Sequence, residues 1–464
     1  MKKFNTSPIS GAQELLPEAQ ATFDHLKTKI NQIYKAHGYQ NVETPCIERT
    51  EVLLAKAGGD TEKQIYEVKK TGEKATTKAS QALRFDHTVP LARYIIEHEN
   101  NLNFPFKVQQ TGPNFRGERA QKGRFREFYQ CDIDIISRDQ LSLAYDADII
   151  STLLDAFKVF DLNTPILARI SNRKILAGLL NSLGLKDQTQ EISNIIDHAE
   201  KVTPEQTKES LEELKLNKQQ VKTILDLVKL NGPRSEVITA LNNLEINDDV
   251  FYQGVSELDQ VLGLLEAINL TEQITADLKI IRGLDYYTGT VFEFILPEHK
   301  NIGSIAGGGR YDNLTQHFSA KSFPGVGGSI GLTRLFYILN EHNLLNISGQ
   351  ELTEYALIPV SEQENEYAFK LANELRTKHH SATIVLTNKK LGDKLSYAAK
   401  IAANGIVIGE EETASGELKV KDFATGKSRD FSFTTEDLLE SDSEKPATSP
   451  TDFWTDPSEP STFL

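Results

Sequence analysis

The spacing of apolar residues predicts a helix near the start of the chain. Between Pro17 and Gly38, apolar side chains recur at helical intervals over residues 18–37. Proline suits the first turn of a helix and glycine its end, so both flanking residues agree with this prediction. Residues 291–295 have the other period: polar and apolar side chains alternate there, which is typical of a half-buried strand.

A β-hairpin is predicted over residues 104–136. Two strand-like runs flank a charged loop at 116–126, and the second run begins at Phe128. Residues 142–160 follow, and their pattern is helical. The hairpin therefore presents a concentrated set of charges at its tip.

The second run of this hairpin has two distinct faces. Because side chains alternate along a strand, Gln130, Asp132 and Asp134 are predicted to share one face. Cys131 and Ile133 then lie on the other face. One side of the strand is therefore polar and acidic.

The composition changes at about residue 173. Leu, Lys and Glu dominate residues 173–270, which predicts a helical insertion between two halves of a sheet. Over 354–409 strand and helix patterns alternate in the order βαβαβ, typical of a small separate α/β domain. From about Glu436 the chain is rich in Ser, Pro and acidic residues, and disorder is expected there.

Length and composition indicate a soluble cytoplasmic protein. The 464 residues suit about three domains, and no apolar run approaches the roughly 20 residues of a membrane span. The start of the chain lacks the apolar segment of a secretory signal. Cys46 and Cys131 are the only cysteines, too few for a thiolate zinc site or a disulfide framework.

The net charge of −15 argues mildly against a nucleic-acid partner, since phosphate binding requires clustered cations. Local charges change this expectation. Residues 440–464 hold six acids and one base, whereas residues 116–126 hold five bases and one acid. The hairpin loop is therefore a candidate phosphate-binding element despite the overall charge.

Two glycine- and tyrosine-containing segments give the strongest chemical signal. Residues 282–290 read Arg-Gly-Leu-Asp-Tyr-Tyr-Thr-Gly-Thr, and residues 306–312 read Ala-Gly-Gly-Gly-Arg-Tyr-Asp. Each places a fixed cation and phenol rings beside glycines that let the backbone approach a ligand closely. A glycine run alone is more often a turn, and a tyrosine pair more often core. The two segments in this order are more informative than either alone.

Three further segments suit the binding of a nucleotide or an amino acid. In the basic loop, guanidinium groups match phosphate oxygens, although a solvated charged loop is the simpler alternative. Small residues from Pro324 lead into a helix with Arg334, although a lone arginine in such a helix is usually a surface residue. Asp86 and Thr88, on a segment predicted to be extended, face the same way and suit an α-ammonium group, while His87 faces away as a structural residue.

Taken together, these segments resemble histidyl-tRNA synthetases over about residues 10–435. The basic loop resembles motif 2 of class II synthetases, and the segment with Arg334 resembles motif 3. The helix at 18–37 with Pro45 resembles the dimer-forming motif 1. The resemblance implies an α+β fold: a class II antiparallel-sheet catalytic core with a helical insertion, plus a C-terminal α/β anticodon-binding domain. The expected parts are the core at 1–172 and 271–345, the insertion at 173–270, the anticodon-binding domain at 352–435 and a disordered acidic tail at 436–464.

The resemblance also implies an activity. Histidine would be activated with ATP, as its Mg²⁺ complex, to histidyl-adenylate and pyrophosphate, and then transferred to the 3′ end of tRNA(His). The implied protein is a homodimeric cytoplasmic ligase without a membrane association and without a metal held by protein ligands alone.

The same resemblance assigns roles to individual residues. Arg116 and Arg282 would be catalytic and hold the α-phosphate. The rest of the ATP site would be Glu118 at the adenine amine, Phe128 against its ring, and Arg124 and Arg334 at the terminal phosphates. Histidine would be bound by Asp86, Thr88 and Gln130 at its α-ammonium and by Asp134 and Tyr287 at its imidazole, with Tyr286 nearby, while Arg119 and Gln121 would approach the tRNA acceptor end.

Two positions depart from the family pattern. Many bacterial members have Glu-Gly where this chain has Asp86 and His87, and often Glu where it has Asp134. Three alternatives stay open: a non-catalytic paralogue of the ATP phosphoribosyltransferase regulatory-subunit type, a synthetase for another amino acid, and a binding module without ATP chemistry. The regulatory type lacks the C-terminal domain, so residues 354–434 favour the ligase.

Overall fold

A computed structural model describes residues 5–55, 62–72, 79–119, 123–199, 202–281, 286–345 and 352–431. The predictions for Gln121, for Arg282 and for the tail at 436–464 concern positions outside these residues. The chain divides into two compact units, residues 1–348 and 349–464, and each is described by itself.

The larger unit is built on a nine-stranded sheet with the order β1-β5-β6-β12-β11-β10-β7-β9-β8. From β5 to β7 all neighbouring strands are antiparallel, whereas β1 pairs with β5 and β7 with β9 in parallel. The strands are β1 (Gln40–Asn41), β5 (Phe106–Phe115), β6 (Glu127–Ile136), β7 (Leu167–Asn172), β8 (Asn231–Gly232), β9 (Ile274–Asp277), β10 (Thr290–Ile295), β11 (Ala306–Tyr311) and β12 (Gly325–Ile330).

Two sequence predictions are confirmed in this sheet. Strands β5 and β6 form the antiparallel hairpin expected over residues 104–136. The segment 291–295 is a strand, β10, although it is not half-buried: its adjacent residues Val291 and Phe292, on opposite faces, are both buried. A smaller antiparallel sheet lies beside this one in the same unit, with the order β2-β4-β3: β2 (Ile47–Arg49), β3 (Glu67–Val68) and β4 (Gln81–Leu83).

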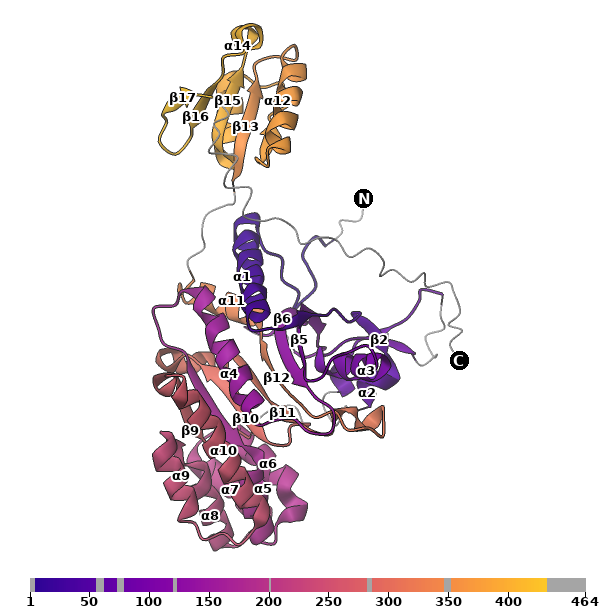
Figure 1. Cartoon of the computed structure of the whole chain (residues 1–464), viewed down its shortest axis with the longest axis vertical. Helices are drawn as coiled ribbons and strands as arrows, with labels where there is room; N and C mark the ends of the chain where they lie inside the picture. The colour runs from indigo at the N-terminus through magenta and orange to yellow at the C-terminus, as the bar shows by residue number, and fades with distance from the viewer. Residues whose placement is uncertain are drawn as a thin grey trace. The chain divides into compact units, whose positions relative to one another are not determined.

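Helices bury one face of the large sheet. The predicted first helix is α1, which begins with Pro17 in its first turn and precedes Gly38 in a left-handed conformation. The side chains of α1 and α4 pack with Cys131 and Ile133 of β6 in one continuous core (Figure 1). On the opposite face, α3 packs near β5. These helices are α1 (Pro17–Ala36), α2 (Thr50–Leu54), α3 (Thr88–His98), α4 (Ala144–Phe157) and α11 (Leu332–Glu341).

Residues 173–267 are mainly helical, as their composition predicted, and they pack at one end of the sheet (Figure 1). Side-chain caps begin several of these helices: Asn172, Thr203, Asn217 and Asp248 each accept from a backbone N–H of the first turn. At Gly232 the short strand β8 joins the sheet. The helices are α5 (Arg173–Ser182), α6 (Thr189–His198), α7 (Pro204–Glu213), α8 (Lys218–Val228), α9 (Arg234–Asn242) and α10 (Asp249–Ala267).

The second unit confirms the predicted βαβαβ order. Its five-stranded sheet has the order β14-β13-β15-β16-β17, with α12 and α13 packing against different buried residues of the sheet. The helix and two strands that follow β15 were not predicted. The unit contains β13 (Thr353–Pro359), α12 (Asn365–Thr377), β14 (Ala382–Ile384), α13 (Leu391–Ile401), β15 (Ala402–Ile408), α14 (Glu410–Ser415), β16 (Lys419–Asp422) and β17 (Ser428–Asp430).

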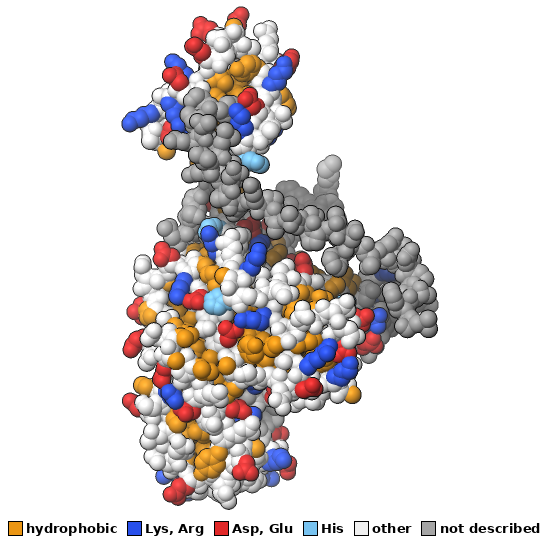
Figure 2. All heavy atoms as spheres, in the orientation of Figure 1, with side chains coloured by type: hydrophobic (Ala, Val, Ile, Leu, Met, Phe, Trp, Pro, Cys, Tyr) orange, Lys and Arg blue, Asp and Glu red, His pale blue; other side chains and the backbone are white. Residues whose placement is uncertain are grey.

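Short 3₁₀ turns complete the described elements: Glu62–Gln64, Lys158–Phe160, Lys186–Gln188, Thr271–Gln273, Pro297–Ile302 and Leu314–His317. Within the described ranges, no helix combines the length and apolar character needed to cross a membrane. On the face drawn in Figure 2, acidic and basic side chains are interspersed over the described surface.

Candidate active site

The polar face of β6 forms the centre of the candidate site. As the alternation predicted, Gln130, Asp132 and Asp134 line a cavity, while Cys131 and Ile133 are buried in the core behind the strand. The strand register places residues of β12 beside them: Gly327 pairs with Asp134 and Ser329 with Asp132. Distant parts of the chain thus meet on one face of the sheet.

Two cavities share this face. We call the smaller, of about 50 Å³, the acidic pocket, and the larger, of about 460 Å³, the arginine cleft. Both are lined by Arg116, Gln130, Tyr287 and Ser329, so they adjoin. The cleft has the size of a typical small-ligand site, whereas the pocket has room for a small polar group.

Every histidine-site residue predicted from the resemblance lines the acidic pocket. Asp132, Tyr311, Gly327, Gly328 and Ser329 complete its wall. The predicted residues present are Asp86, Thr88, Gln130, Asp134, Tyr286 and Tyr287.

The predicted extended segment at Asp86 and Thr88 is wrong. Thr88 is the first residue of α3, and Asp86 Oδ1 accepts from the backbone N–H of Val89 at 3.0 Å. An acidic residue ahead of a proline at position 90 is a helix-start signal that would have indicated this turn. Burial raises the pKa of Asp86 above its ordinary value. Both side chains nevertheless reach the pocket, through a helix start instead of a strand face.

Asp134 is held by a residue that the assigned roles omitted. The Tyr311 hydroxyl donates to Asp134 Oδ1 at 2.7 Å. Burial, with further contributions from Asp132 and Asp86, raises the pKa of Asp134 to about 8 despite this hydrogen bond. Gly327, on the neighbouring strand, permits the Asp134 carboxylate to lie against its backbone, because a Cβ at position 327 would come 2.0 Å from Asp134 Oδ1.

Three tyrosine rings form one wall of the pocket. Tyr286 contacts Tyr287 and Tyr311 edge to face, with ring centroids 5.1 Å and 5.8 Å apart. Burial raises the pKa of all three phenols, so each hydroxyl stays a neutral donor near physiological pH. Tyr311 lies within the quoted segment 306–312. Because side chains alternate along a strand, Tyr311 shares a face with Gly309 two positions earlier, and this spacing was the available signal in the sequence.

The arginine cleft contains the predicted ATP-site residues that the structure describes. The Arg116 guanidinium lies over the rings of Phe85 and Phe128, 4.4 Å and 5.0 Å from their centroids. Glu118 and Arg124 form an ion pair of 3.2 Å across the hairpin loop. These side chains line the cleft together with Arg334.

Arg334 belongs to the site side of its helix. It lies in the first turn of α11, and its Nη2 donates to the Ile302 carbonyl at 3.1 Å. Arg334 is therefore not a plain surface residue, because its side chain lines the cleft and is held by this hydrogen bond. Arg119, by contrast, is exposed and lines neither cavity.

The glycine run is a strand and not a turn. Gly308 and Gly309 lie within β11, where a Cβ on Gly308 would come 2.1 Å from the Gly327 carbonyl oxygen. These glycines therefore serve strand packing as well as the cleft surface. Arg310, the cation of this segment, is not part of either cavity: its Nη2 donates to Asp146 of α4 at 2.7 Å, on the core face. The sequence motif, which places this cation beside glycines, did not indicate that Arg310 faces the core.

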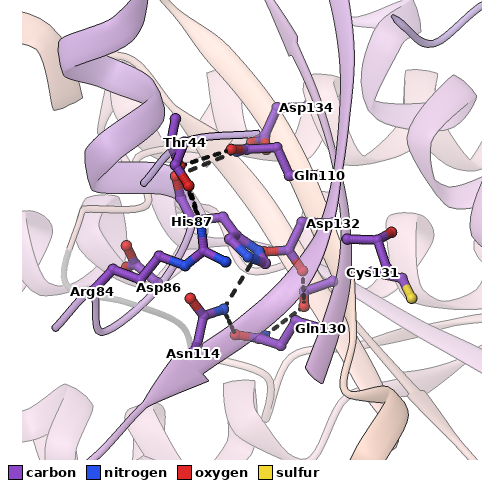
Figure 3. Close-up of polar contacts among 12 residues, drawn as sticks. Thr44, Arg84, Asp86, His87, Gln110, Asn114, Gln130, Cys131, Asp132 and Asp134 are labelled. Atoms are coloured by element: carbon purple, nitrogen blue, oxygen red, sulfur yellow. Dashed lines mark hydrogen bonds and ion pairs between the residues drawn. The ribbon is translucent and has the colours of Figure 1, made fainter. Parts of the chain in front are cut away.

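A polar network behind the pocket was also missed. It joins Asn114, Gln130, Asp132 and His87, which are labelled in Figure 3, and Ser329 lies between Gln130 and Asp132. Its members come from four separate stretches of chain, so no local motif could reveal it. In the described part of the chain, no group of three or more His, Cys, Asp or Glu side chains could hold a metal ion.

Comparisons with known proteins agree with this geometry. The family described as histidyl-tRNA synthetase matches residues 11–335, and an anticodon binding domain matches residues 354–440. A histidine–tRNA ligase of Clostridium tetani is 42% identical over 436 residues, covering 93% of this chain and 98% of that protein. The crystal structure of histidyl-tRNA synthetase from Nostoc sp. PCC 7120 superposes with a TM-score of 0.81 at 34% identity, covering 95% of this chain and 99% of that one.

A more distant structure shares the fold alone. It is described as an ATP phosphoribosyltransferase regulatory subunit/histidyl-tRNA synthetase from Bacillus halodurans, with a TM-score of 0.72 at 20% identity, covering 88% of this chain and 99% of that chain. The arginine cleft and the adjoining acidic pocket lie on a largely antiparallel sheet, and the matches with histidyl-tRNA synthetases place the chain among the aminoacyl-tRNA synthetases. Within that class, the chain belongs to the histidyl-tRNA synthetase family.

Proposed function

We propose that this protein activates histidine with ATP to histidyl-adenylate and pyrophosphate and then transfers histidine to the 3′ end of tRNA(His). One observation supports this most directly: a cleft of nucleotide size adjoins an acidic pocket through Arg116, Gln130 and Tyr287. A carboxylate of an amino acid bound in the pocket would therefore meet a phosphate bound in the cleft.

The acidic pocket is proposed to bind histidine. Asp86, Thr88 and Gln130 offer acceptors for the α-ammonium group. Asp134 accepts from one imidazole nitrogen and Tyr287 engages the other, with Tyr286 nearby. An amino acid without an imidazole would leave the Tyr287 hydroxyl and the second oxygen of Asp134 without these contacts, which is the physical basis of selection.

The arginine cleft is proposed to bind ATP. Arg116 and Arg282 hold the α-phosphate, and Arg124 and Arg334 the terminal phosphates. Phe128 stacks on adenine, and Glu118 accepts from its amine once the ion pair with Arg124 opens. The amino-acid carboxylate attacks the α-phosphorus and pyrophosphate leaves, a step that depends on positioning and on charge stabilisation.

Mg²⁺ would accompany ATP. Glu118 and Glu293 are carboxylates that line the cleft, and oxygen ligands suit this ion. When bound, Mg²⁺ would neutralise charge on the phosphates.

The remaining parts are proposed to serve tRNA. Arg119 and Gln121 approach the acceptor end, and residues 352–435 bind the anticodon. The other proposed parts of the chain are a catalytic core at 1–172 and 271–345, an insertion at 173–270 and a tail at 436–464.

We further propose a homodimer in the cytoplasm without a membrane association.

Pyrophosphate exchange tests this proposal. Exchange between ATP and pyrophosphate is measured with each amino acid in turn, followed by charging of tRNA(His). Among the amino acids, histidine alone should support exchange. In the second assay, tRNA(His) should accept histidine on its 3′ end. Histidine binding without exchange would instead indicate the regulatory-subunit type, and exchange with another amino acid would refute the selection by Asp134.

A further inference from the structure

A continuous chain of hydrogen bonds connects residues that line the acidic pocket with residues behind it (Figure 3). Asn114 Nδ2 donates to Gln130 Oε1 at 2.7 Å, and Gln130 Nε2 donates to Ser329 Oγ at 2.6 Å. The Ser329 hydroxyl donates to Asp132 Oδ1. His87 Nδ1 lies 2.8 Å from Asp132 Oδ2. The chain therefore runs from Asn114 to a histidine that lines neither cavity, and Asn114 Nδ2 also lies 3.4 Å from Nδ1 of that histidine.

The chemistry of Asp132 sets the direction of this chain. A carboxylate only accepts, so the hydrogen on His87 Nδ1 and the hydroxyl hydrogen of Ser329 both point at Asp132. Ser329 has a single hydrogen, so its oxygen must accept from the Gln130 amide nitrogen. Gln130 Oε1 is thereby left as an acceptor, with one lone pair for Asn114 and one for a ligand.

His87 is fixed where it can hold this direction. Its side chain is 1% exposed, and that of Asp132 is 7% exposed. The His87 carbonyl accepts from Gln110 Nε2 at 3.4 Å, and Gly112 lies under the ring, where a Cβ would come 3.5 Å from Nε2. Without the His87 imidazole as donor, Oδ2 of the buried Asp132 carboxylate would lose its hydrogen-bond partner, which is unfavourable.

We propose that His87 is a positioning residue for the amino-acid substrate. Through Asp132 and Ser329 it keeps the Gln130 amide oriented with its oxygen available to the α-ammonium group. The inference rests on the proposed function, in which Gln130 binds that group. Without the His87 donor, the Asp132 carboxylate is no longer fixed beside Ser329, so the Ser329 hydroxyl can donate elsewhere and the Gln130 amide can turn and present N–H groups to a cation. ATP binding should depend on this orientation much less, because the cleft arginines proposed to hold the phosphates are not members of the chain, although Gln130 and Ser329 also line the cleft.

Two substitutions at one position test the role. His87→Leu removes the donor, whereas His87→Asn retains a side-chain N–H near the position of Nδ1. His37→Leu is the matched control, because His37 Nε2 lies 3.0 Å from Asp155 Oδ2 in a His–Asp pair that lines neither cavity. Pyrophosphate exchange of the full chain gives KM for histidine, KM for ATP and kcat, and thermal unfolding gives Tm.

His87→Leu should raise KM for histidine about tenfold or more, which corresponds to loss of a hydrogen bond to a charged group. KM for ATP should stay within about twofold, and His87→Asn should recover most of the histidine affinity. His37→Leu should change Tm without changing either KM.

Equal changes in both KM values, or a lower Tm with an unchanged KM for histidine, would overturn the inference. If His87→Leu does not fold, Ser329→Ala breaks the same chain with a smaller volume change, and an unchanged KM for histidine there would also overturn it. Absence of histidine-dependent exchange in the unaltered chain would refute the proposed function, and this inference with it.

Discussion

At the scale of single residues, burial decides the charge of Asp134. Its carboxyl lies in a pocket with two further carboxyl groups, and its pKa is raised to about 8. The Tyr311 hydroxyl donates to it and lowers the pKa, but desolvation is the larger effect. Asp134 is therefore a neutral acid near physiological pH, and a cationic ligand would favour its ionised form.

This raised pKa predicts a pH-dependent stability. The folded carboxyl keeps its proton up to about pH 8. The unfolded carboxyl releases its proton near the ordinary aspartate pKa of about 3.9. Between these values the folded state binds more protons, so the contribution of Asp134 to the free energy of unfolding falls as pH rises. Asp134→Asn removes this titration. Denaturant unfolding from about pH 5 to about pH 9 should show the wild type losing stability relative to the variant.

A difference between the two proteins that stays constant with pH would contradict the raised pKa. The asparagine variant retains a carbonyl oxygen for the Tyr311 hydroxyl, so it serves as its own control for that hydrogen bond.

Asp134 should also govern the use of histidine. Asp134→Ala removes an acceptor for an imidazole N–H and leaves the Tyr311 hydroxyl without its partner. The kcat/KM for histidine in pyrophosphate exchange should fall by about 10²-fold or more, because a buried polar contact is lost. KM for ATP should stay nearly unchanged. An equal loss in ATP use would show that Asp134 does not select the amino acid.

At the scale of elements, α4 is joined to the sheet by a buried ion pair. The Arg310 guanidinium contacts Asp146 with Nε at 3.1 Å and Nη2 at 2.7 Å, and it also donates to the carbonyls of Leu141 and Ser142. The Asp146 side chain is fully buried. The segment after the glycine run therefore connects β11 to a helix on the core face.

Removing one member of this pair should be costly. Asp146→Ala leaves the Arg310 cation buried without its carboxylate and should lower the free energy of unfolding by about 3–5 kcal/mol. Asp148→Ala is the control on the same helix: Asp148 pairs with Lys107 at 2.7 Å but is 33% exposed, so its loss should cost at most about 1 kcal/mol. Denaturant unfolding of both variants measures the difference, and similar values for the two would contradict the importance of burial.

At the scale of the whole molecule, the two units divide the chemistry. All residues that line the acidic pocket and the arginine cleft precede residue 335, within the first unit. The second unit has its own sheet and its own cores. Amino-acid activation and tRNA recognition should therefore separate when the chain is divided.

A chain of residues 1–348 tests this separation. It should keep histidine-dependent pyrophosphate exchange, because both cavities are intact, and it should charge tRNA(His) with a kcat/KM reduced by at least about tenfold, since the anticodon-binding domain is missing. The full chain, assayed in parallel for exchange and charging, is the control. Equal charging by the two proteins would refute the role of the second unit.

Much of the architecture follows from the sequence by itself. The helical period of residues 18–37, the β5–β6 hairpin and the βαβαβ order of the second unit were predictable, because each element must bury its own apolar side. The same alternation indicated that Gln130 and Asp134 share a face. The nucleotide and amino-acid residues were assigned by family resemblance, and those that the structure describes line two adjoining cavities.

Only the tertiary structure decided which side chains meet. Tyr311 and Asp134 are 177 positions apart, and Ser329 and Asp132 are 197 apart, yet each pair is in contact. Apolar periodicity records which side of an element is buried, but it carries no information about the partner across the sheet. For the same reason the sequence could not indicate that Arg310 turns to the core, or that His87 completes a network behind the pocket.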